Sequence, residues 1–237
     1  MDVRNDILLY EDNDIESFAL IPKKLERNRF TVKLEKIAKR AIDILGGLCG
    51  MFLLIPLTIG LWIANKIAKD NGPIFYTQDR IGKNGKIFKM YKYRSMVVGA
   101  DEKLKKYLEE NEEARKEFKE YKKLKSDPRI TKIGKFIRKT SLDEFPQFIN
   151  VLKGEMSLVG PRPYMPRERE DLNGFFNYIT SCKPGITGLW QTSGRSGTTF
   201  TERLTLDMSY YYNHTLKSDI KILYKTVENV IKKEGAI

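Results

Sequence analysis

The chain has 237 residues, which is enough for one domain with a full core and an added element but too few for two large domains. Its formal net charge of +12 indicates an anionic partner, which could be nucleic acid, an anionic lipid surface or a phosphorylated substrate. The two cysteines, Cys49 and Cys182, lie far apart, which argues against a disulfide framework or a paired-cysteine metal site, and we expect the single histidine, His214, to be structural.

Residues 1–35 are mixed polar and apolar without a clear period, and we interpret them as an N-terminal extension. Residues 44–65 then form an uncharged apolar run that would be about 33 Å long as a helix, which is enough to cross a bilayer. A polar segment precedes the run, so it does not have the form of a cleaved signal peptide. Apolar residues occupy every face of this helix, a pattern that favours lipid over a protein core. We therefore predict a membrane helix over residues 36–70.

Basic residues flank this run on both sides, at Lys33, Lys36, Lys39, Arg40, Lys66 and Lys69. Lysine and arginine prefer the cytoplasmic side of a membrane, so both ends are drawn to the same side. Pro56 lies near the middle of the run, where it removes a backbone hydrogen bond and can bend the helix. These features predict a re-entrant helical hairpin. A single kinked spanning helix is the alternative.

The rest of the chain, residues 71–237, is predicted to be a cytosolic catalytic domain. Residues 74–96 alternate apolar and basic side chains around a turn at residues 83–86, which predicts a basic β-hairpin. Residues 101–125 are rich in Glu and Lys with sparse apolar positions, which predicts one exposed amphipathic helix. The expected fold is a helix-rich α/β mixture with a short sheet.

Two adjacent carboxylates, Asp143 and Glu144, follow a basic stretch that contains Arg138. Neighbouring acids can divide two tasks, one as nucleophile and the other as metal ligand, when nearby cations keep the nucleophile ionised. The same residues also fit a capping box, in which Ser141 caps a helix and Glu144 reaches back to it. The two interpretations are compatible, because a helix N-terminus also attracts phosphate.

Two further segments are candidates for phosphate binding. In residues 160–163, two prolines fix the backbone on either side of Arg162, which can then present its guanidinium for bidentate contact with a phosphate. In residues 183–195, glycines permit close approach of the backbone and Arg195 adds positive charge. Each segment taken singly is also compatible with an ordinary surface turn.

The order of the motifs is more specific than any one of them. An apolar segment with a central proline is followed by QDRIGKNGKIFKMYKYRSM, TSLDEFPQFINVLKGEMSLVGPRP, KPGITGLWQTSGR and LDMSYYYNHTLKSDIKIL. This order resembles the monotopic polyprenyl-phosphate phosphoglycosyl transferases of the bacterial sugar transferase family, over about residues 33–233. The resemblance implies a Mg²⁺-dependent enzyme at the cytoplasmic face of the bacterial inner membrane. Such an enzyme transfers a sugar 1-phosphate from a UDP-sugar to undecaprenyl phosphate and releases UMP.

The resemblance also implies roles for individual residues. Asp143 would attack the donor phosphorus and form an aspartyl-phosphosugar intermediate, and Glu144 would bind Mg²⁺. Basic family positions that contact the donor correspond to Lys92, Arg138, Arg162 and Arg195. An acidic family position corresponds to Asp207, which we assign to substrate binding, although it could equally cap or pair structurally.

One position departs from the family pattern. Many relatives have serine immediately before the proline of the membrane segment, where its hydroxyl can satisfy backbone groups freed at the bend. Here Ile55 precedes Pro56. We expect a different way of stabilising the bend and no loss of activity.

Two rival functions remain open at this point. The charge of +12 and the aromatic residues Tyr91 and Tyr93 among basic ones would also fit a non-catalytic membrane adaptor or a nucleic-acid-binding module. A glycosyltransferase that releases UDP is the closer rival. The resemblance favours the phosphoglycosyl transferase, for which no nucleic-acid partner is expected.

Overall fold

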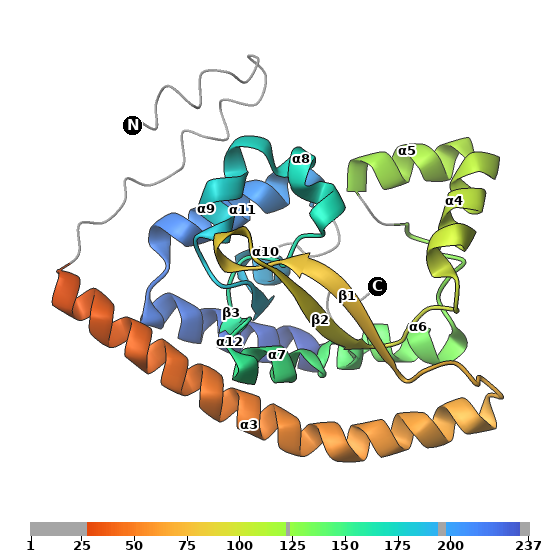
Figure 1. Ribbon diagram of the computed structural model, residues 1–237, viewed down its shortest axis with the longest axis horizontal. Coiled ribbons are helices and arrows are strands. Elements are labelled where there is room, and N and C mark those ends of the chain that lie inside the picture. The colour runs from red at the N-terminus through yellow and green to blue at the C-terminus, as the bar shows by residue number, and fades with distance from the viewer. Residues whose placement is uncertain (1–27, 122–123, 194–197, 233–237) are drawn as a thin grey trace.

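The computed structural model describes residues 28–121, 124–193 and 198–232. One long helix lies along one side of the molecule, and the other elements are packed along its concave side (Figure 1). Helices predominate, and the strands of the described residues form two separate two-stranded sheets. The predicted helix-rich mixed fold with a short sheet is therefore confirmed.

The long helix, α3 (Arg29–Ile67), is continuous over 39 residues. It begins earlier than predicted because the Asn28 side chain accepts a hydrogen bond from the backbone N–H of Phe30 at 2.9 Å and caps the helix. The helix continues through Pro56 and curves gently without turning back (Figure 1). The expected helical hairpin is thus not present, and Pro56 lies within the helix without ending it.

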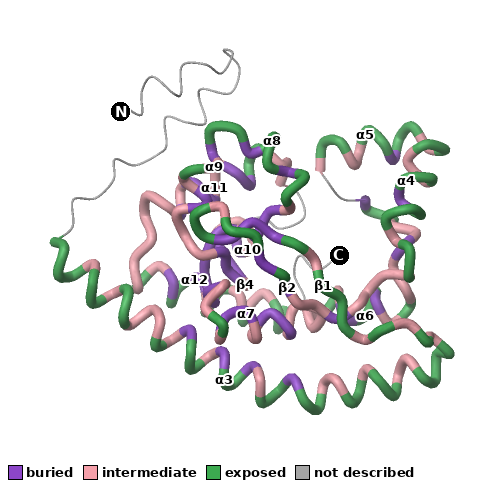
Figure 2. The backbone as a smooth tube through the Cα atoms, viewed as in Figure 1, coloured by how far each residue is buried: buried purple, intermediate pink, exposed green. Residues whose placement is uncertain are grey.

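One face of α3 is held against the other elements by polar contacts. Lys39 donates to a carboxylate oxygen of Asp219 at 2.6 Å, and Arg40 donates to two carbonyl groups at the end of α7 (Gln147–Lys153) at 2.7 and 2.9 Å. Asp43 accepts two hydrogen bonds at the start of β3 (Ser157–Val159) at 2.9 and 2.8 Å. Figure 2 shows buried positions on α3 only at intervals, with exposed and intermediate ones between them. The helix therefore has one protein-facing side and one open side.

The predicted hairpin is confirmed. Strands β1 (Phe75–Ile81) and β2 (Ile87–Tyr93) pair antiparallel, with Phe75 opposite Tyr93 and Ile81 opposite Ile87. A 3₁₀ turn, η1 (Lys83–Gly85), joins them, and its residues Asn84 and Gly85 have positive φ values of 57° and 74°. Asparagine and glycine tolerate this left-handed conformation best, so the sequence at the turn matches its geometry.

The charged segment after the hairpin is amphipathic as predicted, but the single helix is wrong. It forms two helices, α4 (Ala100–Glu110) and α5 (Glu112–Tyr121). Asn111 between them is extended (φ −132°, ψ 106°), and its side chain accepts from the backbone N–H of Ala114 at 3.0 Å. Asparagine here prefers to cap a new helix over continuing the previous one.

The second sheet is parallel and lies in the interior. Strands β3 (Ser157–Val159) and β4 (Gly185–Thr187) are joined by a connection that begins with a loop at Gly160 and continues through short helices. A side chain on Gly160 would come within 2.3 Å of the carbonyl oxygen of Lys183, so only glycine permits this approach of the two segments. The sheet belongs to the main hydrophobic core, together with residues of β2, α7, α11 and α12.

The remaining elements connect these parts in chain order. They are α6 (Lys132–Lys139), η2 (Leu142–Glu144), α7 (Gln147–Lys153), η3 (Pro166–Glu168), α8 (Arg169–Leu172), η4 (Asn173–Phe175), α9 (Phe176–Thr180), α10 (Leu189–Ser193), α11 (Phe200–Asn213) and α12 (Leu216–Lys232).

Candidate active site

Asp143 and Glu144 lie in η2, a short turn between α6 and α7. The turn starts at Ser141, which adopts a left-handed conformation with φ 56°. The predicted capping box is wrong, because the Ser141 side chain makes no cap hydrogen bond. A helix starting at Ser141 would place Pro146 beyond its first turn, where proline cannot donate and clashes with the preceding turn. The two carboxylates are therefore carried by a tight turn.

Predicted basic residues from two other elements meet this turn. Lys92, on β2, donates from its Nζ to Oε1 of Glu144 at 3.0 Å. Lys92 and Arg138, which is in the last turn of α6, both act electrostatically on Asp143. The structure thus brings together Lys92, Arg138, Asp143 and Glu144, which are separated by up to about fifty residues in the sequence.

The surroundings set the pKa of Asp143 close to neutrality. Burial disfavours the charged form and raises the pKa of Asp143 to about 6, although the charge of Lys92 lowers it. The neighbouring Glu144 raises the pKa further and Arg138 lowers it. The carboxylate of Asp143 is ionised for the most part at pH 7, in a site where its charge is poorly solvated.

Asp207, on α11, is fully buried and holds the loop that carries Arg162. Its Oδ2 accepts from the backbone N–H of Arg162 at 3.1 Å and from the hydroxyl of Tyr164 at 2.7 Å. Burial raises the pKa of Asp207 to about 7, against the lowering effect of these hydrogen bonds. The predicted direct contact of Asp207 with substrate is therefore not confirmed, and its observed contacts are those of a residue that positions the loop.

The side chain of Arg162 lies over an indole. Its guanidinium carbon is 5.4 Å from the ring centroid of Trp190, on α10, and that of Arg203, on α11, is 5.3 Å from the same ring. Trp190 and Arg203 were not assigned roles from the sequence, since a single tryptophan or arginine gives no pattern. Arg195, the basic residue predicted to bind phosphate in residues 183–195, lies outside the described residues.

A buried arginine that the sequence did not single out joins the two parts of the site. Arg80, on β1, donates from Nη1 to the carbonyl oxygen of Pro163 at 2.8 Å. Burial lowers the pKa of Arg80 to about 9, Arg162 lowers it further, and Glu168 and Glu144 raise it. The pKa of Arg80 is therefore affected by charges of both the Arg162 loop and the η2 turn. Its place in an alternating strand gave no signal that distinguishes it from the other basic residues of the hairpin.

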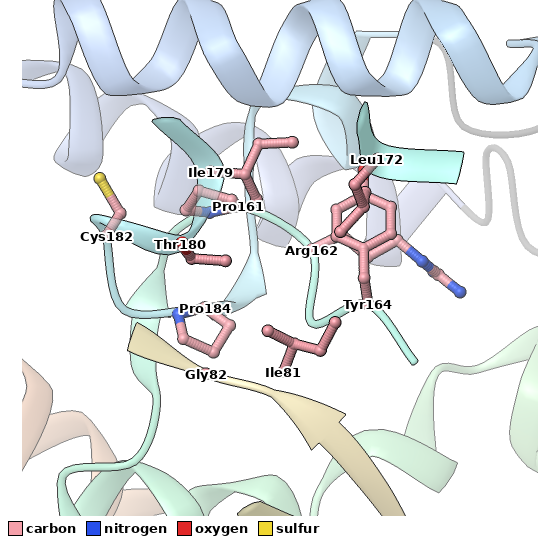
Figure 3. A pocket seen from close by; sticks show the side chains of 10 residues that line it. All are labelled: Ile81, Gly82, Pro161, Arg162, Tyr164, Leu172, Ile179, Thr180, Cys182 and Pro184. Atoms are coloured by element: carbon pink, nitrogen blue, oxygen red, sulfur yellow. The ribbon is translucent and has the colours of Figure 1, made fainter. Parts of the chain in front are cut away.

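A small cavity lies beneath the Arg162 loop. It is lined mainly by apolar side chains such as Ile81, Pro161 and Leu172, while the guanidinium of Arg162 points away from them (Figure 3). The cavity volume of about 10 Å³ is at the limit for a single water molecule. It is a packing gap behind the loop, too small to hold a substrate.

Helix α3 is held by two hydroxyl groups close to Pro56. Thr58 donates to the carbonyl oxygen of Leu54 at 2.7 Å, and the hydroxyl of Tyr93 donates to the same oxygen at 3.2 Å. The two hydroxyl groups are 2.6 Å apart. The carbonyl that loses its usual donor to Pro56 is that of Phe52, four residues earlier, so these hydrogen bonds hold the helix beside the proline and do not replace the missing bond. Tyr93 directly follows Lys92 on β2, so this part of α3 and the η2 turn are held by neighbouring residues.

Glu144 is the residue that could hold Mg²⁺. Among the residues that the structure describes, no group of three or more Asp, Glu, His or Cys side chains gathers as a metal site. In phosphate-transfer sites, however, Mg²⁺ commonly takes one or two carboxylates and fills its other positions with water and substrate phosphate. The side chain of Glu144 is 37% exposed, which fits such a role.

His214 has structural contacts at the end of α11, as predicted. It forms the C-cap of α11, and its Nδ1 lies 3.2 and 3.1 Å from the carbonyl oxygens of Tyr210 and Tyr211. Its ring stacks on that of Tyr210 with a centroid separation of 5.4 Å.

Comparison with known proteins identifies relatives over most of the chain. The sequence model of bacterial sugar transferases matches residues 34–233. The chain is 45% identical over 210 residues to the undecaprenyl-phosphate galactose phosphotransferase of Salmonella typhimurium, covering 89% of this chain and 44% of the relative. It is 37% identical over 202 residues to the UDP-glucose:undecaprenyl-phosphate glucose-1-phosphate transferase of Escherichia coli, covering 82% of this chain and 40% of the relative.

A shorter relative is matched over nearly its full length. The chain is 38% identical over 200 residues to the exopolysaccharide production protein ExoY of Rhizobium meliloti, covering 84% of this chain and 88% of the relative. The chain therefore spans less than half the length of the Salmonella and Escherichia relatives but most of ExoY. These matches confirm the resemblance inferred from the order of the motifs.

Proposed function

Because this chain belongs to the bacterial sugar transferase family, we propose that it transfers a sugar 1-phosphate from a UDP-sugar to undecaprenyl phosphate and releases UMP. The product, an undecaprenyl diphosphate sugar, would enter the assembly of a surface glycan. The observation that carries this proposal is the η2 turn. There Asp143, with a pKa of about 6, lies next to Glu144 and under the influence of two cations.

The proposed first step uses Asp143 as nucleophile. A carboxylate oxygen attacks the donor phosphorus that carries the sugar, and a new O–P bond forms. The bridging P–O bond of the diphosphate breaks, and UMP leaves with the electron pair. A carboxylate with a pKa of about 6 suits this step, because it is ionised at pH 7 yet weakly solvated.

The proposed second step restores the enzyme. A phosphate oxygen of undecaprenyl phosphate attacks the same phosphorus, and the bond between that phosphorus and Asp143 breaks. The carboxylate leaves with the electron pair, and the sugar is now joined to the lipid through a diphosphate. No proton transfer is required when both phosphate groups are ionised.

Positive charge supports the phosphates in both steps. We assign Lys92 and Arg138 to the phosphates near Asp143, and Arg162 to the donor at the neighbouring loop. Glu144 would hold Mg²⁺, which when bound neutralises charge on the diphosphate. The ion pair between Lys92 and Glu144 is 3.0 Å long and would rearrange as this cation binds.

We propose that α3 inserts into the cytoplasmic leaflet of the inner membrane, with the catalytic elements on the cytoplasmic side. Within the described part of the chain, α3 is the one helix long and apolar enough to cross a membrane. However, its concave side packs against β3, α7 and α12, which carry polar and charged residues (Figure 1). A straight crossing would draw these elements into hydrocarbon, which is costly, whereas a helix lying in one leaflet avoids this.

The test is nucleotide release from a panel of UDP-sugars by detergent-solubilised protein with Mg²⁺ and undecaprenyl phosphate. We expect UMP from the wild type and no turnover from Asp143→Asn, which removes the nucleophile without changing its size. The control is Asp79→Asn, because Asp79 is exposed on β1 and pairs only with Lys89 in the described contacts.

The rival functions predict other outcomes. A glycosyltransferase would release UDP. A basic adaptor or nucleic-acid-binding module would release no nucleotide from any donor, and Asp143→Asn would leave its binding unchanged.

A further inference from the structure

An open groove of about 460 Å³ lies between the second half of α3 and α6. This volume is within the range of about 300 to 1,000 Å³ that is usual for small-molecule sites. The groove contrasts with the gap beneath the Arg162 loop, which holds about 10 Å³. It is thus the larger of the two spaces and the one with room for an organic ligand.

The lining of the groove is apolar. From α3 it includes Pro56, Gly60 and Ala64, which are four residues apart and so share one face of the helix. From α6 it includes Ile133 and Phe136, and Phe136 is 60% exposed. Large apolar side chains left exposed at an open groove indicate an apolar occupant, because they gain free energy when covered.

The groove reaches the η2 turn that carries the candidate nucleophile. Leu142 lines it and directly precedes Asp143 in η2. The charged groups nearby are cations of α6: Lys132 lines the groove, and Arg138 acts electrostatically on Asp143. A ligand with a hydrocarbon chain and an anionic end would match this arrangement, with its chain along α3 and its anionic end toward Asp143.

We propose that this groove holds the first part of the polyprenyl chain of the acceptor lipid and thereby delivers the acceptor phosphate to Asp143. The inference rests on the proposed function, for which it names the acceptor subsite. Continuity with the η2 turn favours this occupant over an ordinary membrane lipid, since Leu142, which lines the groove, adjoins Asp143 in that turn.

Gly60 allows the groove to be filled without disturbing the fold. A Cβ atom added at Gly60 would meet nothing within 4 Å, so a larger side chain there occupies open space. Gly60 is exposed and within a helix, where replacing glycine also removes its unfavourable helix propensity. Gly60→Leu should therefore fold and shorten the groove, and Gly60→Ala should have a smaller effect.

The matched control is Cys49→Leu. Cys49 is an exposed small residue of the same helix and does not line the groove, so it adds similar bulk elsewhere on α3. Both variants are measured in two reactions: the initial release of UMP from the donor without acceptor, and steady-state transfer at increasing concentrations of undecaprenyl phosphate.

We expect Gly60→Leu to raise the KM for undecaprenyl phosphate at least about tenfold, which corresponds to about 1.4 kcal/mol of binding. The initial release of UMP should be unchanged, and Cys49→Leu should behave as wild type in both reactions. An unchanged acceptor KM in Gly60→Leu would overturn the proposal. So would an equal loss of the initial UMP release, because this would place the effect on the donor step.

A second measurement does not depend on turnover. A polyprenyl phosphate with a photoreactive group on the isoprene units nearest the phosphate should label α3 and α6 in the wild type, and undecaprenyl phosphate should compete. Labelling elsewhere, or equal competition by phosphatidylglycerol, would reject the acceptor as the specific occupant. If the wild type released no UMP from any donor but this labelling held, the proposed reaction would fail while the lipid groove stood.

Discussion

Two carboxylates with raised pKa values lie beside basic side chains, Asp143 in the η2 turn and Asp207 on helix α11, and their settings differ. Asp143 is partly exposed in η2, and the pKa of about 6 reflects burial opposed by Lys92. Asp207 is fully buried, and its pKa of about 7 reflects burial opposed by hydrogen bonds to the Arg162 loop. Burial raises both pKa values, so a raised pKa alone does not identify a catalytic group. Access to the carboxylate and the groups that its oxygens contact make the distinction.

The largest effect in this comparison is expected from Lys92→Met. The Lys92 ammonium contacts Glu144 and holds the pKa of Asp143 down, and the substitution removes it. We expect kcat/KM to fall by about 10²- to 10³-fold, as for the loss of one charge-stabilising group. The proposed attack needs ionised Asp143, so wild-type activity should fall as the pH falls through about 6. In the variant this acid limb should move to higher pH.

The measurement is the pH dependence of kcat/KM for UMP release. Lys89→Met is the control, because Lys89 lies on the same strand and pairs with the exposed Asp79. An acid limb at the same pH in wild type and Lys92→Met would contradict the assignment of the cation to Asp143.

A smaller, pH-dependent effect on stability is expected from Asp207→Asn. The folded-state pKa of about 7 exceeds the ordinary value of 3.8, so between these values the folded protein binds more protons at this site than the unfolded chain. The contribution of Asp207 to stability is therefore complete below about pH 4 and is lost as the pH rises through about 7. Each unit of pKa difference corresponds to about 1.4 kcal/mol.

Chemical denaturation of wild type and Asp207→Asn in detergent at several pH values checks this. The wild type should lose more unfolding free energy than the variant between about pH 4 and pH 7. Parallel pH dependences of the two proteins would rule out a raised pKa at Asp207. Asp79→Asn, at an exposed position, should change neither curve appreciably.

The smallest effect is expected from Tyr93→Phe, which tests whether η2 depends on α3. The variant loses the hydrogen bond to the carbonyl oxygen of Leu54 and the contact with Thr58, and should lose about 1 kcal/mol of unfolding free energy. Because Tyr93 adjoins Lys92, activity should also fall by a few-fold at most. Tyr76→Phe is the control on the exposed part of β1. Equal stability of the two variants would argue against an effective anchor on α3.

Much of the candidate site could be predicted because its parts are marked locally. The acid pair at residues 143 and 144, the loop around Arg162 and the hairpin at residues 75–93 each have a distinctive residue order. The roles of Arg80, Trp190 and Arg203 could not be predicted in the same way, because their significance comes from the elements they contact. The contacts of Asp207 with the Arg162 loop could not be predicted for the same reason, since they depend on how α11 packs against that loop.

The sequence by itself determined the apolar character of α3, the hairpin and the presence of an acid pair in a basic setting. These follow from residue type and spacing along one segment. Only the tertiary structure decided that α3 continues through Pro56, that η2 replaces a capping box, and that Lys92 meets Glu144. The physical reason is that each outcome depends on partners distant in the sequence, such as the Tyr93 hydroxyl that contacts α3. Local propensity sets which structures a segment can form, and contacts between segments select one of them.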